Sequence, residues 1–320
     1  LTAGTWTVVG ILSIWAVVIT RLLVGRLPFH GWVLAVLVAV LAFTIVLNPA
    51  RRPTRPEGLQ VIFLAAGKGD AILINCPNGQ RWMVDTGREV DATRVNGTLA
   101  RLRKHGVAHL DGVVLTHPDE DHSGGVVTLT RAIESDEVVT TCPTLFDPRF
   151  ATTLSRLHQR GISIRCVWAG AMLGDSCGDG IEVLWPLLDA PASDNDHSLV
   201  VRIAHQGVRM LLTGDLEADG EAAMIEHGID LQASAMKLGH HGSPGASSAP
   251  FLAKVAPEIV VVSGYPTRSN APTHHDILAR VGQIGARLLS TESCGARGFT
   301  LSRSGIWAVG ADSSGRRPRR

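Results

Sequence analysis

The segment THPDEDHSGG at residues 116–125 gathers side chains that bind metals. Four potential ligands, His117, Asp119, Asp121 and His122, lie within six residues of one another, directly after the apolar run 112–115. A divalent cation accepts imidazole nitrogen and carboxylate oxygen together, and it relieves the repulsion among acids in a short loop. A solvated acidic loop is the alternative. The residue types and their spacing favour a metal site at the end of a strand.

Two later segments place further ligands after apolar runs. The run LLTGD ends at Asp215, and the segment KLGHHGS, residues 237–243, contains His240 and His241. Each segment alone is a weak signal, because Gly-Asp is common in turns. In a layered α/β protein, however, the ends of several strands meet at one edge of a sheet. The three segments together therefore predict one metal centre.

The elements that must position these residues follow from Leu59 onward. Short β-rich runs cover residues 59–65, 71–76 and 81–85, with a turn at Asn78-Gly79 between the last two. Helical periodicity covers residues 92–105, and a strand is expected at residues 112–116. Further alternation runs through residues 200–204, 208–213, 218–227, 233–238 and 259–263. Antiparallel strands with interspersed helices predict two sheets sandwiched between helices.

The order of these ligands resembles that of the metallo-β-lactamase superfamily. More specifically, the chain is similar to the C-terminal domain of the ComEC family, polytopic competence proteins that carry transforming DNA across the bacterial membrane. The similarity lies in FLAAGKGDAIL (63–73), VDTG (84–87), HPDEDHSGG, NDHSLV (195–200), LLTGD and KLGHHGS. It implies an α/β fold, the metallo-β-lactamase αββα sandwich, preceded by two transmembrane helices.

The resemblance also implies roles for the metal ligands. Metal one would be held by His117 and Asp119, metal two by Asp121, His122 and His240, and Asp215 would bridge the two ions. His241 would donate a proton or bind phosphate, and Asp121 would share in catalysis; the roles of His240 and His241 could be exchanged.

The superfamily's third histidine has no clear match in this chain. Asn195 and His197 are the candidates in the stretch 194–197. Asp119 in place of a histidine, with Asn195 as a second replacement, makes the donor set harder, so two divalent ions, Mn²⁺ or Zn²⁺, are expected. The stretches AAGKGD (65–70) and APTH (271–274) also depart from the ComEC pattern.

The chemistry that such a centre supports is hydrolysis at phosphorus. Lys237, Ser243, Ser263 and Asn270 are candidates for holding phosphate oxygens, with structural hydrogen bonds as the alternative. Asp70 and Asp85 are expected to orient the ligands.

The predicted function is a metal-dependent hydrolase of phosphodiesters, a nuclease domain that degrades one strand of transforming DNA. The alternatives are a phosphocholine-type phosphodiesterase and a non-catalytic DNA-binding module. A net charge of +1 gives no general polyanion-binding signal, so DNA binding depends on the site. The expected partners are DNA, the membrane, other competence-channel components and an upstream part of the same protein, since the chain is expected to begin partway through a longer one.

The first 50 residues are expected to form two transmembrane helices, because the runs 5–20 and 31–47 lack charge and approach membrane-spanning length. A buried soluble hairpin is the alternative. A basic, proline-rich linker (51–58), the domain proper (59–310) and a disordered basic tail (311–320) would follow. We expect an integral membrane protein with the domain on the extracytoplasmic side, although the flanking basic residues do not fix its orientation.

The cysteines number five and form no CxxC pair. They are expected to be unpaired thiols, with a Cys166–Cys177 disulfide as an option outside the cytoplasm.

Overall fold

The computed structural model describes residues 58–310, apart from residues 68, 94–96, 175, 191–194, 264–271 and 292–294. The chain divides into two units, Leu1–Thr54 and Arg55–Arg320, and the described residues belong to the second. The two predicted transmembrane helices, most of the linker and the basic tail lie outside the described residues. Within the described part of the chain, none of the helices has the length and apolar character to cross a membrane.

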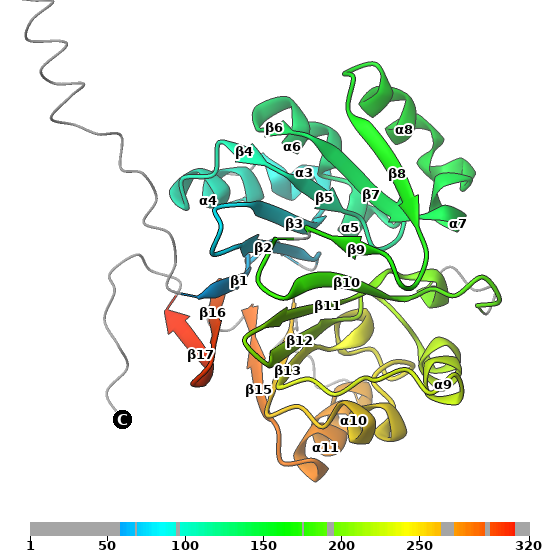
Figure 1. The fold of residues 1–320 in the computed structure, drawn as a ribbon. Helices are drawn as coiled ribbons and strands as arrows, with labels where there is room; N and C mark the ends of the chain where they lie inside the picture. Colours follow the sequence, from blue (N-terminus) through cyan, green and yellow to red (C-terminus); the bar gives the residue numbers. More distant parts are fainter. Residues whose placement is uncertain are drawn as a thin grey trace, which may run out of the picture. The chain divides into compact units, whose positions relative to one another are not determined.

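Two large sheets form the centre of the domain (Figure 1). In spatial order, the eight-stranded sheet contains β17 (Gly305–Gly310), β16 (Arg297–Ser302), β1 (Leu59–Phe63), β2 (Ala71–Asn75), β3 (Arg81–Thr86), β5 (Gly112–Val114), β7 (Glu137–Thr141) and β8 (Ser163–Val167). The seven-stranded sheet contains β15 (Arg287–Ser290), β14 (Ile259–Val262), β13 (Ala235–Lys237), β12 (Val208–Leu212), β11 (Val200–His205), β10 (Gly180–Trp185) and β9 (Met172–Leu173). A small pair joins β4 (His109–Leu110) to β6 (Glu134–Ser135).

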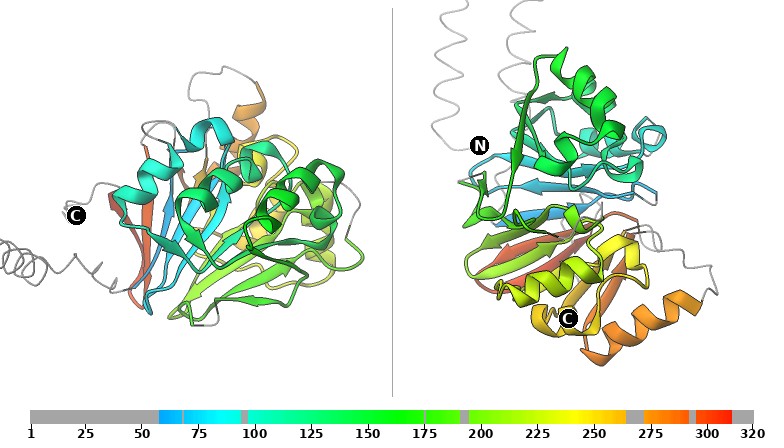
Figure 2. Two further views of the ribbon diagram at one scale, coloured as in Figure 1. Left: turned by 90° about the horizontal axis from the view of Figure 1, so that it is seen from above. Right: turned by 90° about the vertical axis from the view of Figure 1, so that its right-hand side faces the viewer.

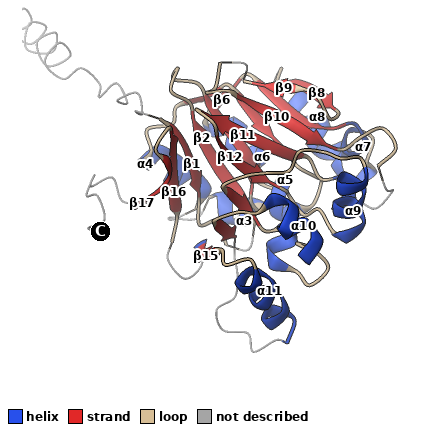
Figure 3. Cartoon of the chain, turned by 60° about the horizontal axis from the view of Figure 1, so that its bottom comes forward, coloured by secondary structure: helices blue, strands red, loops and turns tan. Residues whose placement is uncertain are grey.

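Helices cover the outer faces of both sheets (Figure 2; Figure 3). The eight-stranded sheet is covered by α4 (Thr98–Lys104), α6 (Val126–Ala132) and α8 (Ala151–His158). The seven-stranded sheet is covered by α9 (Ala218–Glu226), α10 (Ala249–Val255) and α11 (Pro272–Gln283). Shorter elements are α3 (Glu89–Ala92), α5 (Glu120–Ser123), α7 (Cys142–Leu145), and the 3-10 turns η1 (Pro148–Phe150), η2 (Asn195–His197) and η3 (Gly239–Gly242). The predicted αββα sandwich is confirmed.

The strands are apolar on both faces because both faces are buried. On β1, Val61 and Phe63 face the core between the sheets, whereas Ile62 faces the helices outside. On β2, Ile72 likewise faces the inner core and Leu73 the outer one. Successive side chains on a strand point to opposite faces, so a strand between two cores needs apolar residues at nearly every position.

Strand direction gathers the loops that carry the predicted ligands. The sequence pattern predicted antiparallel strands, but the sheets are mixed: β3, β5, β7 and β8 run parallel, and so do β12 to β15. The carboxyl ends of parallel strands meet at one edge of a sheet. The loops that follow β3, β5, β7, β12 and β13 therefore lie at a common edge of the sandwich.

The single helix predicted over residues 92–105 is wrong. The structure ends α3 at Ala92 and begins α4 at Thr98, with Gly97 in an extended conformation at the helix N-cap. Gly97 interrupts the pattern because glycine disfavours a helix interior.

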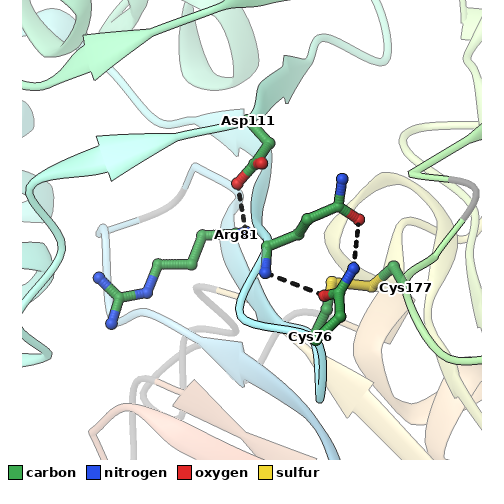
Figure 4. The surroundings of a disulfide bond; sticks show 6 residues. Cys76, Arg81, Asp111 and Cys177 are labelled. Atoms are coloured by element: carbon green, nitrogen blue, oxygen red, sulfur yellow. Dashed lines mark hydrogen bonds between the residues drawn. A yellow bond between two sulfur atoms is a disulfide. The ribbon is translucent and has the colours of Figure 1, made fainter. Parts of the chain in front are cut away.

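The prediction of unpaired cysteines is also wrong, and so is the Cys166–Cys177 option. Cys76 pairs with Cys177, and Cys142 pairs with Cys166. The first bond joins the end of β2 to the loop before β10 and so ties the two sheets together (Figure 4). Cys76 follows β2 whereas Asp70 precedes it, so the bond lies at the edge opposite the predicted ligands. The pairing depends on how the sheets face each other, which cysteine spacing along the chain does not reveal.

Candidate metal centre

Five segments that are far apart in the sequence bring polar side chains to the common edge. Asp70 precedes β2, and Asp85 lies at the end of β3. The loop after β5 carries His117, Asp119, Asp121 and His122; the loop after β12 carries Asp215; and the η3 turn after β13 carries His240 and His241. The structure therefore brings all six predicted metal ligands, and His241, to one place.

Asp215 lies between two sets of imidazoles. Its Oδ1 is 3.1 Å from Nε2 of His122, and its Oδ2 is 3.6 Å from Nε2 of His241. The same Oδ2 is 3.9 Å from Nε2 of His117 and 3.8 Å from Nε2 of His240. A carboxylate with donors on both sides has the arrangement required of a ligand that bridges two metal ions.

The two ends of the centre hold different partners. On one side, Nε2 of His117 is 3.7 Å from Oδ2 of Asp119. On the other side, Nε2 of His241 is 3.1 Å from Nε2 of His122 and 3.7 Å from Oδ2 of Asp121. The structure thus brings His241, and not His240, to Asp121 and His122, which favours the exchanged roles of the two histidines.

Carboxylates behind two of the histidines fix their orientation. Asp85 accepts a hydrogen bond from Nδ1 of His122 at 2.7 Å, and Oε1 of Glu217 lies 2.6 Å from Nδ1 of His240. Each contact occupies Nδ1 and directs Nε2 toward Asp215. Metal-binding histidines are commonly held in this way by an outer carboxylate. Glu217 had not been predicted, although it lies only two residues after Asp215.

Asp70 and Lys237 form a buried ion pair behind the centre, with Nζ of Lys237 2.7 Å from Oδ2 of Asp70. One oxygen each of Asp70 and Asp215 and one nitrogen each of His122 and His241 lie within 4.8 Å of one another. Asp70, however, faces Nδ1 of His122 and Nδ1 of His241, both at 3.7 Å. The Nε2 atoms of both histidines face Asp215 instead, and Asp70 makes no hydrogen bond to either imidazole among the described residues, so its close partner is the Lys237 ammonium.

Burial and close opposite charges shift the pKa values of these groups. Burial alone would lower the pKa of His122, but Asp215 and Asp85 raise it well above the usual value. Burial would raise the pKa of Asp215, but His122, His241 and the Lys237 ammonium hold it well below its usual range. The pKa of His117 is lowered well below normal, first by burial and then by the charge of His122. His117 is therefore a neutral imidazole, the form that binds metals.

The donor set fits divalent cations. Nε2 of His117 is buried and has no hydrogen-bond partner among the described residues. Such an orphaned nitrogen is costly in a protein interior. It faces carboxylate oxygens of Asp119 and Asp215 at 3.7 and 3.9 Å. Imidazole nitrogen beside carboxylate oxygens is the ligand chemistry of zinc and manganese sites.

The four residues predicted to hold phosphate have different placements. Lys237 is 1% exposed and Ser263 2% exposed, so both lie beneath the surface of the site. Nζ of Lys237 donates to the carbonyl of Gly214 at 2.6 Å, so its partners are protein groups and its burial does not fit a contact with substrate. Ser243 is partly exposed next to the histidines, and Asn270 lies outside the described residues.

Two further residues lie at the centre's border. Nδ2 of Asn195 is 3.5 Å from Nδ1 of His240, which makes Asn195 the candidate from the stretch 194–197 that reaches the histidine loop. Arg149 donates from Nη1 to Oδ1 of Asp119 at 3.2 Å. Arg149 had not been predicted, because it lies outside every motif and reaches the centre only through the fold.

Comparisons with known proteins agree with this geometry. Residues 64–264 match the model of the metallo-beta-lactamase superfamily. The chain is 31% identical over 245 residues to "Competence protein ComA" of Neisseria gonorrhoeae, covering 76% of this chain and 32% of that protein. It is 27% identical over 250 residues to "ComE operon protein 3" of Bacillus subtilis, covering 74% and 32%. The chain thus spans about a third of the length of these relatives, and the predicted resemblance to competence proteins is confirmed.

Among solved structures, the fold is similar to that of CmlA, a diiron beta-hydroxylase from Streptomyces venezuelae. The TM-score is 0.54 at 14% identity, covering 77% of this chain and 55% of CmlA, so the similarity concerns the fold alone. The family match covers more than half of the chain and includes the loops that carry His117, His122, Asp215 and His241. This chain belongs to the metallo-beta-lactamase superfamily.

Proposed function

We propose that this chain carries a metal-dependent phosphodiesterase domain that cleaves DNA during competence-linked DNA uptake. The observation that carries the proposal is the position of Asp215 between His117 on one side and His122 with His241 on the other. The relatives named competence proteins supply the context in which the substrate is DNA.

In this proposal, His117, Asp119 and His240 would hold one divalent cation and Asp121, His122 and His241 the second, and Asp215 would contribute to both sites. When bound, the two cations supply an activated water and stabilise charge on the phosphate oxygens during in-line displacement. The protein's own part is to orient the donors. Asp85 and Glu217 hold His122 and His240 by Nδ1, so that each presents Nε2 to the centre.

The donor set makes Mn²⁺ or Zn²⁺ the proposed metals. Asp119, Asp121 and Asp215 contribute carboxylate oxygens in addition to the imidazole nitrogens. A larger share of hard oxygen donors makes a site more favourable for manganese than a site with mostly nitrogen donors would be. A metal titration followed by calorimetry, with each ion in turn, would establish the order of affinity.

The test is digestion of fluorescent single- and double-stranded DNA by the full chain in detergent with Mn²⁺, beside an Asp121→Ala variant. We expect cleavage that depends on both the metal and Asp121. Arg209→Ala is the matched surface control. Arg209 lies on β12 of the seven-stranded sheet and pairs with Asp230 at 2.7 Å. Cleavage that persists in EDTA or in Asp121→Ala would contradict the proposal. Hydrolysis of a phosphocholine diester without DNA cleavage would indicate a lipid or cell-wall substrate, and metal-independent DNA binding without hydrolysis would indicate a binding module.

We further propose that the domain is tethered to the membrane on its extracytoplasmic side. The uncharged runs 5–20 and 31–47 support the tether. The two disulfides, Cys76–Cys177 and Cys142–Cys166, support the side, because such bonds persist in oxidising compartments and are rare in the cytoplasm. Labelling of intact cells with a membrane-impermeant reagent at lysines of the domain tests the side.

A further inference from the structure

An exposed aromatic side chain lies on the segment that leads from β7 to α8. Phe146 follows α7 directly and is 81% exposed. A single exposed apolar side chain is common on protein surfaces, so the significance of Phe146 depends on where it lies. Phe146 lies beyond the carboxyl end of β7, which is the edge of the sandwich that carries the metal centre.

Arg149 connects this segment to the loop after β5, residues 115–125, which we call the metal loop. Its guanidinium donates to Asp119 at 3.2 Å, and it is held from behind by Asp147, with Nη2 donating to Oδ2 at 2.6 Å. The Arg149 side chain is half-exposed, so its guanidinium lies at the surface beside the centre. Phe146 precedes Arg149 by three residues, so their Cα atoms are at most about 11 Å apart. A nucleotide and its adjoining phosphate can span that distance.

The segment is held in a defined position. The disulfide between Cys142 and Cys166 ties α7 to β8. The Thr141 side chain accepts a hydrogen bond from the backbone N–H of Thr144, which caps α7, and Asp147 caps the turn that contains Arg149. Exposed side chains on a fixed backbone lose little freedom when they bind, which favours a recognition surface.

Arg149 is the cation of this segment that lies beside the centre. Residues 142–160 also contain Arg156 and Arg160, but α8 leads away from the edge of the metal centre, and Arg160 donates to the carbonyl of Thr130 at 2.9 Å. Proteins that hold single-stranded nucleic acid combine such positive charge with aromatic side chains on which bases stack. In a duplex the base faces are covered by neighbouring pairs, so a protruding ring selects an unpaired strand.

We propose that Phe146 and Arg149 form a strand-binding rim of the metal centre, with Phe146 stacking on a base of single-stranded DNA and Arg149 contacting the adjoining phosphate. This inference rests on the proposed function and adds to it the preferred form of the substrate. The rim would pass a single strand toward Asp119 and the metal loop.

The test uses the full chain in detergent. Anisotropy titrations with a labelled single-stranded oligonucleotide in EDTA are expected to show about tenfold weaker binding for Phe146→Ala. Trp307→Ala is the matched control, because it removes another exposed aromatic, 57% exposed, from the far end of the same sheet. For Arg149→Ala, the slope of log affinity against log salt is expected to fall by about 0.7, the value for one phosphate contact on a single strand. Arg209→Ala is its control.

Turnover with Mn²⁺ separates the rim from the centre. In Phe146→Ala, the ratio of kcat/KM for the oligonucleotide to that for bis(p-nitrophenyl) phosphate is expected to fall about tenfold. Unchanged affinity and an unchanged ratio in Phe146→Ala would overturn the rim and leave the phosphodiesterase intact. Wild-type protein that binds the oligonucleotide through Phe146 but hydrolyses neither substrate would overturn the proposed function and support the rim. If Phe146→Ala lost binding to anionic vesicles and kept its affinity for DNA, Phe146 would be assigned to membrane contact and the rim would be overturned.

Discussion

Asp85 shows how one buried carboxylate orients a candidate metal ligand. It accepts hydrogen bonds from the backbone N–H and the hydroxyl of Thr116, both at 2.8 Å, and from Nδ1 of His122 at 2.7 Å. Its backbone lies in the left-handed region with φ 55°, where asparagine and aspartate are tolerated better than most residues. An asparagine can therefore replace it without forcing the chain to move.

We predict that Asp85→Asn lowers metal affinity about 10- to 100-fold while the protein stays folded. The amide would donate toward Nδ1 of His122 and move the imidazole proton to Nε2, the atom that must bind the metal. Calorimetric titration with Mn²⁺ or Zn²⁺ measures the effect. Asp111→Asn is the matched control, because Asp111 accepts from the backbone of Arg81 at 2.7 Å away from the centre. Equal affinities of Asp85→Asn and wild type would contradict this role.

The buried Asp70–Lys237 ion pair acts on stability. Burial opposes the Lys237 ammonium, yet Asp70 and Asp215 raise its pKa above the usual value. We predict that Lys237→Met lowers the free energy of unfolding by about 3–5 kcal/mol, because it strands the buried charge of Asp70. Urea denaturation of metal-free protein measures this loss. The double variant Asp70→Asn/Lys237→Met should recover part of it; a double variant less stable than Lys237→Met would argue against the pairing.

At the scale of elements, the loop of residues 239–248 must hold two histidines in an unfavourable conformation. His240 and His241 have φ of 44° and 50°, a region costly for residues other than glycine. Two outer helices hold the loop in place. Glu221 of α9 accepts from the backbone N–H groups of Ser247 and Ser248, and Arg280 of α11 donates to the carbonyls of residues 244, 246 and 247.

We predict that Arg280→Ala weakens metal binding about tenfold although Arg280 does not touch the centre. Removal of its guanidinium frees three carbonyls of the loop and lets the histidines relax from their strained backbone. Calorimetric metal titration measures the change. Arg287→Ala, an exposed arginine on β15, serves as the control. An Arg280→Ala protein with wild-type affinity would show that the loop holds its shape without α11.

In the whole domain, the two disulfides differ in what they join. Cys76 and Cys177 are 101 residues apart and connect the two sheets. Cys142, at the start of α7, and Cys166 of β8 are 24 residues apart, and β7, which precedes α7, already pairs with β8. In the chain-entropy account, the longer loop gives the larger stabilisation.

We predict that Cys76→Ser/Cys177→Ser lowers the free energy of unfolding by about 2–5 kcal/mol, more than Cys142→Ser/Cys166→Ser does. Urea denaturation without reductant measures both losses. Thiol titration of the denatured, unreduced wild type is expected to find at most one thiol per chain, since two disulfides use four of the five cysteines. Five reactive thiols, or no loss of stability in either double variant, would contradict the disulfides.

From the sequence alone follow the fold class, which is confirmed, and nearly all of the candidate donors, which the structure brings together. The metal loop, Asp215 and the histidine pair were identified because their motifs are local: each places ligands within a few residues of a strand end. The layered α/β architecture followed from apolar runs, which reflect burial on one or both faces of each strand.

How these pieces meet is visible in the folded domain alone. The fold brings His241, and not His240, to Asp121, and it buries Lys237 beneath the centre beside Asp70. It also brings Arg149 to Asp119. It also paired the cysteines. These contacts depend on the order of the strands and on how the two sheets face each other. They therefore involve residues that are tens of positions apart in the sequence. Spacing along the chain specifies which residue types follow a strand, but the register and direction of the strands decide which of them share a site.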